Sequence, residues 1–171
     1  MRFLLLLALV SCATNTVLTE KTDKEAGGGV KFTTSSQLAW VNDLVKTANC
    51  VSNNQKYIDE VKAHKQFDYT DKTSSEVAEL LGSDKIAKVS TYRTKNPVSK
   101  AIATTFAGDK DTVYLNTRRN PRDMKDMVNT LFHERFHLLG FSHGDNSPVG
   151  KENSVNYGAG AMAEKYVEEC K

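Results

Sequence analysis

The chain has 171 residues, of which 39% are hydrophobic, and a formal net charge of +2. This length fits one domain that buries a core, or one domain with a tail. The near-neutral charge argues against a nucleic-acid partner, and no apolar run reaches the ~18–20 residues of a membrane-spanning helix.

The N-terminal residues are typical of an export signal. Arg2 precedes an apolar run at residues 3–10, and Leu9-Val10-Ser11-Cys12 resembles the lipobox of bacterial lipoproteins, in which the cysteine is lipidated. We therefore expect residues 1–12 to be a signal peptide and Cys12 to anchor the exported protein to a bacterial membrane, facing the periplasm or the exterior. The alternative is simple secretion after cleavage at Ala13.

Residues 13–36 are small and polar, so we expect a flexible tether there and a single domain at 37–171. Setting Cys12 aside leaves one pair of cysteines, Cys50 and Cys170. In an oxidising compartment this pair is predicted to form a disulfide, with two buried free thiols as the alternative.

The middle of the chain predicts helices followed by a small sheet. Apolar residues recur at helical spacing over 38–48, whereas residues 57–67 fit either a helix or a strand. A capping box at Thr73 and Glu76 predicts a short helix that ends at Gly82. Three runs rich in strand formers follow at 88–93, 101–106 and 112–116, and the last two flank a hairpin loop.

A second strong helix signal comes after the predicted sheet. Asn120 is a good N-cap and Pro121 suits the first helical position, so we expect a helix that runs to Leu139 and stops at Gly140. Three arginines lie close to the start of this helix: Arg118, Arg119 and Arg122. We expect them to form a solvated face, and the alternative is that they contact the substrate. We also expect a C-terminal helix. The order of elements then predicts an α+β fold with a mixed sheet.

Residues 133–143 read H-E-x-x-H-x-x-G-x-x-H and contain three of the four histidines. Because residues four apart share a helix face, His133 and His137 can present two imidazoles to one metal ion. Glu134 lies about 100° around the helix, beside the ion rather than on it. A break at Gly140 would bring His143 to the same ion. Three imidazoles and a water form an open zinc site of the catalytic kind.

This pattern resembles the signature of the metzincin clan of zinc endopeptidases. The resemblance implies one bound Zn²⁺, with Glu134 as general base and Gly140 as the turn; its ligands would be His133, His137 and His143. It also implies a sheet whose edge strand pairs with an extended substrate, for which residues 112–116 are the candidate.

Beyond the motif the resemblance is looser. Residues 154–157 resemble the metzincin Met-turn without its methionine, for which Met162 is a substitute. Tyr157 is either a core aromatic residue with a satisfied hydroxyl or, as the resemblance implies, a catalytic residue that hydrogen-bonds the oxyanion. We expect the stem of Arg135 to pack in the core and its guanidinium to pair with a carboxylate.

Two alternatives for the third ligand stay open. Tyr157-Gly158 resembles deuterolysin-like aspzincins, whose third ligand is an aspartate, and Asp145 is the one aspartate after the motif. A peptidase with a glutamate ligand would take it from the downstream set Glu152, Glu164, Glu168 and Glu169.

We therefore expect an exported zinc metallopeptidase that acts on a peptide or protein substrate. A zinc-activated water would attack the peptide bond, and Glu134 would move its proton to the leaving amine. The alternative is a non-catalytic zinc-binding lipoprotein, a degenerate protease; the intact Glu134 argues against it.

Overall fold

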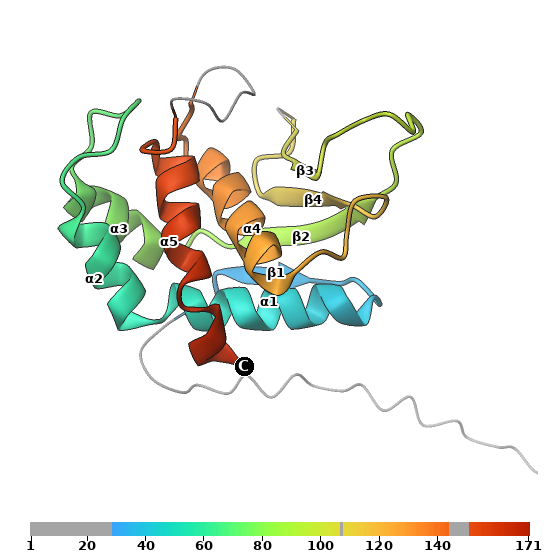
Figure 1. Ribbon diagram of the computed structural model, residues 1–171, viewed down its shortest axis with the longest axis horizontal. Helices are drawn as coiled ribbons and strands as arrows, with labels where there is room; N and C mark the ends of the chain where they lie inside the picture. The colour runs from blue at the N-terminus through green and yellow to red at the C-terminus, as the bar shows by residue number, and fades with distance from the viewer. Residues whose placement is uncertain (1–28, 107, 144–150) are drawn as a thin grey trace, which may run out of the picture.

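The computed structural model (Figure 1) describes residues 29–106, 108–143 and 151–171. These ranges contain five α-helices and four strands, which confirms the predicted α+β class. The strands are β1 (Phe32–Thr34), β2 (Ala87–Tyr92), β3 (Ala103–Thr104) and β4 (Thr112–Asn116). The α-helices are α1 (Ala39–Ser52), α2 (Gln55–Ala63), α3 (Ser74–Gly82), α4 (Met124–Leu138) and α5 (Gly160–Glu164).

The described strands form one mixed sheet in the order β1-β2-β4-β3. β2 pairs in parallel with β1 and β4, and β3 pairs antiparallel to β4, as the predicted hairpin requires. The expected edge strand was wrong: residues 112–116 lie inside the sheet. Because β2 occupies one side of β4, the hairpin places β3 on the other side, and β3 forms the edge.

The predicted tether is wrong at its C-terminal end, because Phe32–Thr34 forms β1; residues 13–28 lie outside the described ranges. Phe32 is fully buried, with its ring centroid 5.4 Å from that of Phe132. Asn49 of α1 binds the backbone here. Its Oδ1 accepts from the amides of Lys31 and Phe32 at 2.8 Å, and its Nδ2 donates to the Phe32 carbonyl at 2.8 Å. One buried aromatic residue and one amide side chain order a segment whose composition is polar.

The helices before the sheet follow the local signals. Residues 55–63 form α2, which decides between the helix and strand alternatives, and Phe67 lies beyond its end. The capping box of α3 is present: the amide of Glu76 donates to Thr73 Oγ1 at 3.3 Å, and Thr73 N donates to Glu76 Oε2 at 2.7 Å. The helix ends at Gly82, as predicted.

The long helix α4 begins later than predicted. Asp123 caps it by accepting from the Lys125 amide at 2.9 Å, and Met124 is the first helical residue. Asn120, the expected cap, is buried and donates from Nδ2 to the carbonyls of Ile102 and Asn116 at 3.0 Å. Its side-chain nitrogen ties the chain to the end of β4, and Asp123 rather than Asn120 caps the helix.

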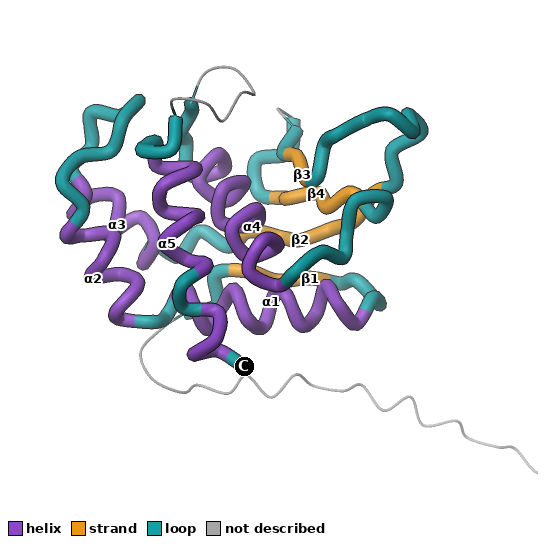
Figure 2. The backbone as a smooth tube through the Cα atoms, viewed as in Figure 1, coloured by secondary structure: helices purple, strands orange, loops and turns teal. Residues whose placement is uncertain are grey.

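The core lies between the sheet and the helices that pack on it. Figure 2 shows α4 in front of the sheet with α5 beside it, and α1 along β1. Phe132 of α4 is at the centre of this core, with its ring 5.4 Å from that of Phe32 and 5.3 Å from that of Tyr57. This buried face holds α4 in place and leaves its opposite face for the histidines.

Arg135 lies on the buried face of α4, with 1% of its surface exposed. Its guanidinium lies 5.4 Å from the Phe32 ring centroid, and Nη2 donates to the carbonyls of Leu81 at 3.3 Å and Lys85 at 3.5 Å. The expected carboxylate partner was therefore wrong. The carbonyls at and just beyond the end of α3 take its place, because a helix C-terminus carries partial negative charge.

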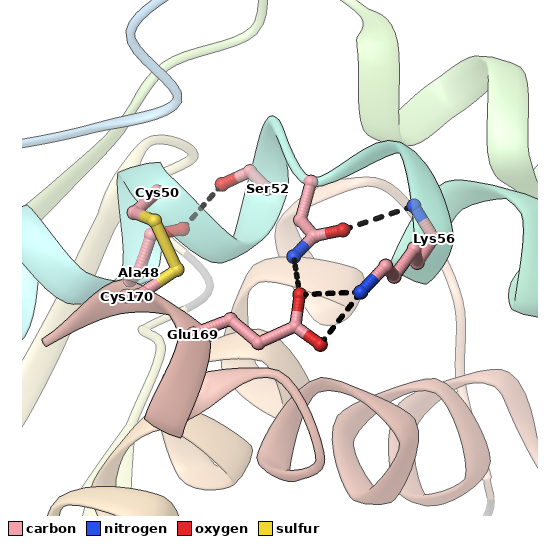
Figure 3. Close-up of a disulfide and its surroundings, with 7 residues drawn as sticks. Ala48, Cys50, Ser52, Lys56, Glu169 and Cys170 are labelled. Atoms are coloured by element: carbon pink, nitrogen blue, oxygen red, sulfur yellow. Dashed lines mark hydrogen bonds and ion pairs between the residues drawn. A yellow bond between two sulfur atoms is a disulfide. The ribbon is translucent and has the colours of Figure 1, made fainter.

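The end of the chain is tied to α1. The predicted disulfide between Cys50 and Cys170 is present and spans 120 residues (Figure 3). Beside it, Glu169 accepts from Lys56 Nζ at 3.0 Å and from Asn54 Nδ2 at 3.1 Å. The predicted C-terminal helix is divided into a π-helical turn η1 (Val155–Ala159), α5, and a 3-10 turn η2 (Val167–Cys170). Across the described ranges, no helix has the length and apolar character needed to cross a bilayer.

Candidate metal centre

The structure brings together the three histidines of the motif. His133 and His137 lie one turn apart on α4, and His143 follows the turn after the helix. Their Nε2 atoms form a nearly equilateral triangle: His133 is 3.2 Å from both His137 and His143, which are 3.1 Å apart. These three nitrogens can hold one metal ion.

The turn at Gly140 positions the third histidine. Gly140 has a φ of +98°, which only glycine adopts readily. Its amide donates to the His137 carbonyl at 3.0 Å, and the amide of Phe141 donates to the Phe136 carbonyl at 3.0 Å. The rings of Phe136 and Phe141 also contact each other, 5.8 Å apart. These contacts form a Schellman motif, so the break predicted at Gly140 is confirmed, one residue after the α-helical cap.

The surroundings of His133 and His137 favour the neutral form that binds metals. His137 Nδ1 lies 3.0 Å from the carbonyl oxygen of Phe141, and because a carbonyl can only accept, Nδ1 carries the proton. The lone pair of His137 Nε2 therefore faces the other histidines. Burial, together with the neighbouring rings of His137 and His143, lowers the pKa of His133 to about 3, and burial also lowers the pKa of His137.

The π-helical turn η1 packs against this cluster. The ring of Tyr157 lies 4.4 Å from that of His133 and 4.8 Å from that of His143, centroid to centroid. Asn156 is fully buried and donates from Nδ2 to the His133 carbonyl at 3.1 Å. The segment expected to act as the Met-turn thus contacts the histidines through Tyr157, whereas Met162 packs against the hydrophobic core. Sequence reasoning missed Asn156, since nothing in its local pattern predicts that contact.

A cavity of about 810 Å³ opens onto the three histidines. Its walls are the segment 100–105, which includes the edge strand β3, and the histidine-bearing face of α4. Glu134 and Tyr157 also line it, and burial raises the pKa of the Glu134 carboxyl to about 7. A smaller cavity of about 230 Å³ borders His137 from the side of Phe106 and Leu138.

Three residues that line the larger cavity were not singled out from the sequence: Asp126, Asn129 and Thr130. Arg122 and Glu164 also line it; they were alternatives for a substrate contact and for a metal ligand. Helical spacing carried a signal for some of them. Asp126, Thr130, His133 and His137 follow one another at intervals of four, three and four residues, which places them on one helix face.

The structure describes the glutamates proposed as alternative third ligands but not the aspartate. Asp145 lies outside the described residues. Among the residues that the structure describes, the metal-binding group comprises the three histidines and no glutamate. Glu164 accepts from Asn129 Nδ2, while Glu168 and Glu169 pair with lysines. The fourth histidine, His64, lies elsewhere, with Nε2 2.6 Å from Asn153 Oδ1.

No protein-family model, curated protein or solved structure matches this chain. The features that indicate a function are therefore the geometry of His133, His137 and His143 and the cavity beside them.

Proposed function

We propose that this protein is a zinc metallopeptidase of the metzincin type that hydrolyses peptide bonds in peptides or proteins. The observation that carries the proposal is the triangle of three Nε2 atoms, 3.1–3.2 Å on a side, formed by histidines that line the cavity. Glu134, which follows the first histidine, lines the same cavity.

The spacing of the nitrogens suits zinc. Zinc binds imidazole nitrogen at about 2.0–2.1 Å in tetrahedral geometry. Nitrogens 3.1–3.2 Å apart, each at that distance from one ion, subtend angles of about 100° at the ion, close to the tetrahedral value. Three neutral nitrogen ligands leave one position open, as in catalytic zinc sites.

A zinc ion held in this way polarises a substrate carbonyl and lowers the pKa of water. The residues of this chain supply the other functions. A carboxylate oxygen of Glu134 takes the proton of the attacking water and delivers it to the nitrogen of the leaving amine. The hydroxyl of Tyr157, whose ring is held against His133 and His143, donates to the developing oxyanion.

We further propose that the protein works outside the cytoplasm, lipidated at Cys12. The support is the apolar run and lipobox-like residues at 2–12, which lie outside the described ranges, and the Cys50–Cys170 disulfide, which persists in oxidising compartments. Cys12→Ala should move the protein from the membrane to the soluble fraction. A mature N-terminus at Thr14 would contradict lipidation and indicate secretion.

Peptide hydrolysis tests the activity directly. The purified protein is incubated with an undirected mixture of peptides, with and without a chelator, and the products are identified by mass spectrometry. We expect cleavage that the chelator abolishes and added zinc restores. Zinc binding with no hydrolysis of any peptide would favour the non-catalytic zinc-binding alternative.

A further inference from the structure

The cavity extends from the histidines along α4 to Arg122, which lies just before that helix. Arg122 Nη2 donates to Thr130 Oγ1 at 2.6 Å and to the Asp126 carbonyl at 3.2 Å. Thr130 lies one helical turn before His133, and residues at that spacing have Cβ atoms about 5–6 Å apart. The guanidinium is therefore held within one or two turns of the metal centre, on the same wall of the cavity.

The guanidinium is only partly paired. Its Nη1 atom has one anionic neighbour, Asp126 Oδ2, at 3.8 Å, which is too long for a hydrogen bond. Its Nε atom is buried and makes no hydrogen bond within the described part of the chain. The Arg122 side chain is 26% exposed, whereas that of Asp126 is 57% exposed. A mostly buried cation thus has a weak, solvated counter-charge, and a second anion at Nη1 would stabilise it.

With a divalent ion on the histidines, the charges around the cavity favour an anion there. Lys100 and Arg122 are its cationic lining residues, and Asp126, Glu134 and Glu164 its acidic ones. Glu164 already accepts a hydrogen bond from Asn129. A divalent ion on the three histidines gives the whole lining a net positive charge, and the low dielectric of a cavity strengthens its attraction for an anion.

We propose that Arg122 binds a carboxylate of the substrate and so selects peptides with an acidic group close to the scissile bond. This inference rests on the proposed peptidase function, because only the substrate of a peptidase has a scissile peptide bond. An extended peptide advances about 3.3–3.6 Å per residue, so a carboxylate one or two residues from the metal-bound carbonyl reaches the guanidinium. The carboxylate comes from an Asp or Glu side chain or from the C-terminus of the peptide.

Binding to a zinc-loaded Glu134→Gln protein tests the proposal without turnover. Two C-terminally amidated peptide mixtures that differ only by Glu or Gln at a central position are compared by calorimetry. A third mixture has neutral residues and a free C-terminal carboxylate, and its control is the same mixture amidated. We expect tighter binding of one carboxylate mixture than of its neutral control, by on the order of 10- to 100-fold. A preference for the Glu mixture over the Gln mixture would show that Arg122 binds an acidic side chain. A preference for the free C-terminal carboxylate over the amide would show that it binds a peptide C-terminus.

Variants of Arg122 then assign the preference. In the Glu134→Gln background, Arg122→Gln and Arg122→Met should lose the preference while they keep their zinc; the methionine variant retains much of the apolar stem. Arg118→Gln is the matched control, because Arg118 is exposed and does not line the cavity, and it should keep the preference. Zinc content and thermal unfolding verify that each variant is folded.

The outcomes separate this inference from the proposed function. Equal binding of every carboxylate mixture and its neutral control overturns the role of Arg122. A preference that survives in both Arg122 variants also overturns it, because the metal ion or Lys100 would then bind the carboxylate. If the carboxylate preference depends on Arg122 but the parent protein cleaves none of the peptides, the anion site stands and the peptidase proposal fails.

Discussion

His137 donates from Nδ1 to the carbonyl oxygen of Phe141 at 3.0 Å, so a residue of the candidate metal centre on α4 is hydrogen-bonded to the turn that follows the helix. The bond sets the tautomer of His137 and requires the chain to reverse at Gly140. The turn is therefore part of the candidate site, because it orients His137 and also positions His143 beside it.

Replacing Gly140 with alanine tests that coupling. A side chain at a φ of +98° strains the backbone, at a cost of roughly 1–2 kcal/mol, although an added Cβ meets nothing within 4 Å. We expect Gly140→Ala to lower both the free energy of unfolding, measured in denaturant, and the zinc affinity. Gly82→Ala is the matched control, since Gly82 has the same open space without the positive φ. Unchanged zinc affinity in Gly140→Ala would contradict the coupling.

Metal analysis of His143→Ala tests the third ligand. Loss of one of three imidazoles should greatly reduce bound zinc, since two ligands hold the ion poorly. His64→Ala is the control, because His64 lies outside the cluster and bonds to Asn153. If His143→Ala retains zinc and Asp145→Ala loses it, the aspzincin-like alternative replaces the metzincin-like one.

Glu134→Gln tests the proposed base. Glutamine keeps the shape and hydrogen bonding of the side chain but cannot take up a proton, so peptide hydrolysis should fall by a factor on the order of 10²–10⁴. Zinc content should match that of the parent, because Glu134 is not a member of the metal-binding group. Equal rates of cleavage by parent and variant would remove the proposed mechanism, and joint loss of zinc and activity would make Glu134 a ligand.

The disulfide should contribute measurably to stability. The bridge closes a loop with a sequence separation of 120, and disulfides typically contribute roughly 2–4 kcal/mol to the free energy of unfolding. We expect the double variant Cys50→Ala, Cys170→Ala to have a free energy of unfolding lower by about this amount. A reductant should destabilise the parent and leave the double variant unchanged. Two alkylatable thiols in the exported protein, found by mass spectrometry, would contradict the pairing.

Asn49 should anchor β1. In Asn49→Ala the amides of Lys31 and Phe32 and the Phe32 carbonyl lose their side-chain partner, which should cost about 2–3 kcal/mol of the free energy of unfolding. Faster hydrogen exchange at those two amides should accompany the loss. Asn42→Ala is the control on the same helix, because Asn42 bonds only to exposed carbonyls at 36 and 38. Equal destabilisation by the two variants would argue against the anchoring role.

Some expectations failed where a distant partner overrode a local signal. Asn120 has the sequence of a helix cap, yet its amide bonds to Ile102 and Asn116, and α4 starts after Asp123. The segment containing Phe32 has the composition of a tether, yet it pairs with β2 and is bound by Asn49. In both cases a contact with a segment well removed in sequence is involved: Asn120 bonds to Ile102, and Phe32 bonds to Asn49.

The sequence by itself determined the local features of the site. The i, i+4 spacing of His133 and His137 and the glycine at 140 predicted two imidazoles on one helix face and a turn after them, since helix geometry relates residues that are neighbours in sequence. The cysteine count likewise predicted the pairing of Cys50 with Cys170, and the capping box predicted the start of α3.

Only the tertiary structure decided which distant residues complete the site. Tyr157 and Asn156 reach the histidines because η1 packs against α4. β3, rather than β4, forms the edge of the sheet beside the cavity. Such contacts depend on how buried faces such as that of Phe132 pack together, and packing between distant segments has no fixed spacing along the chain.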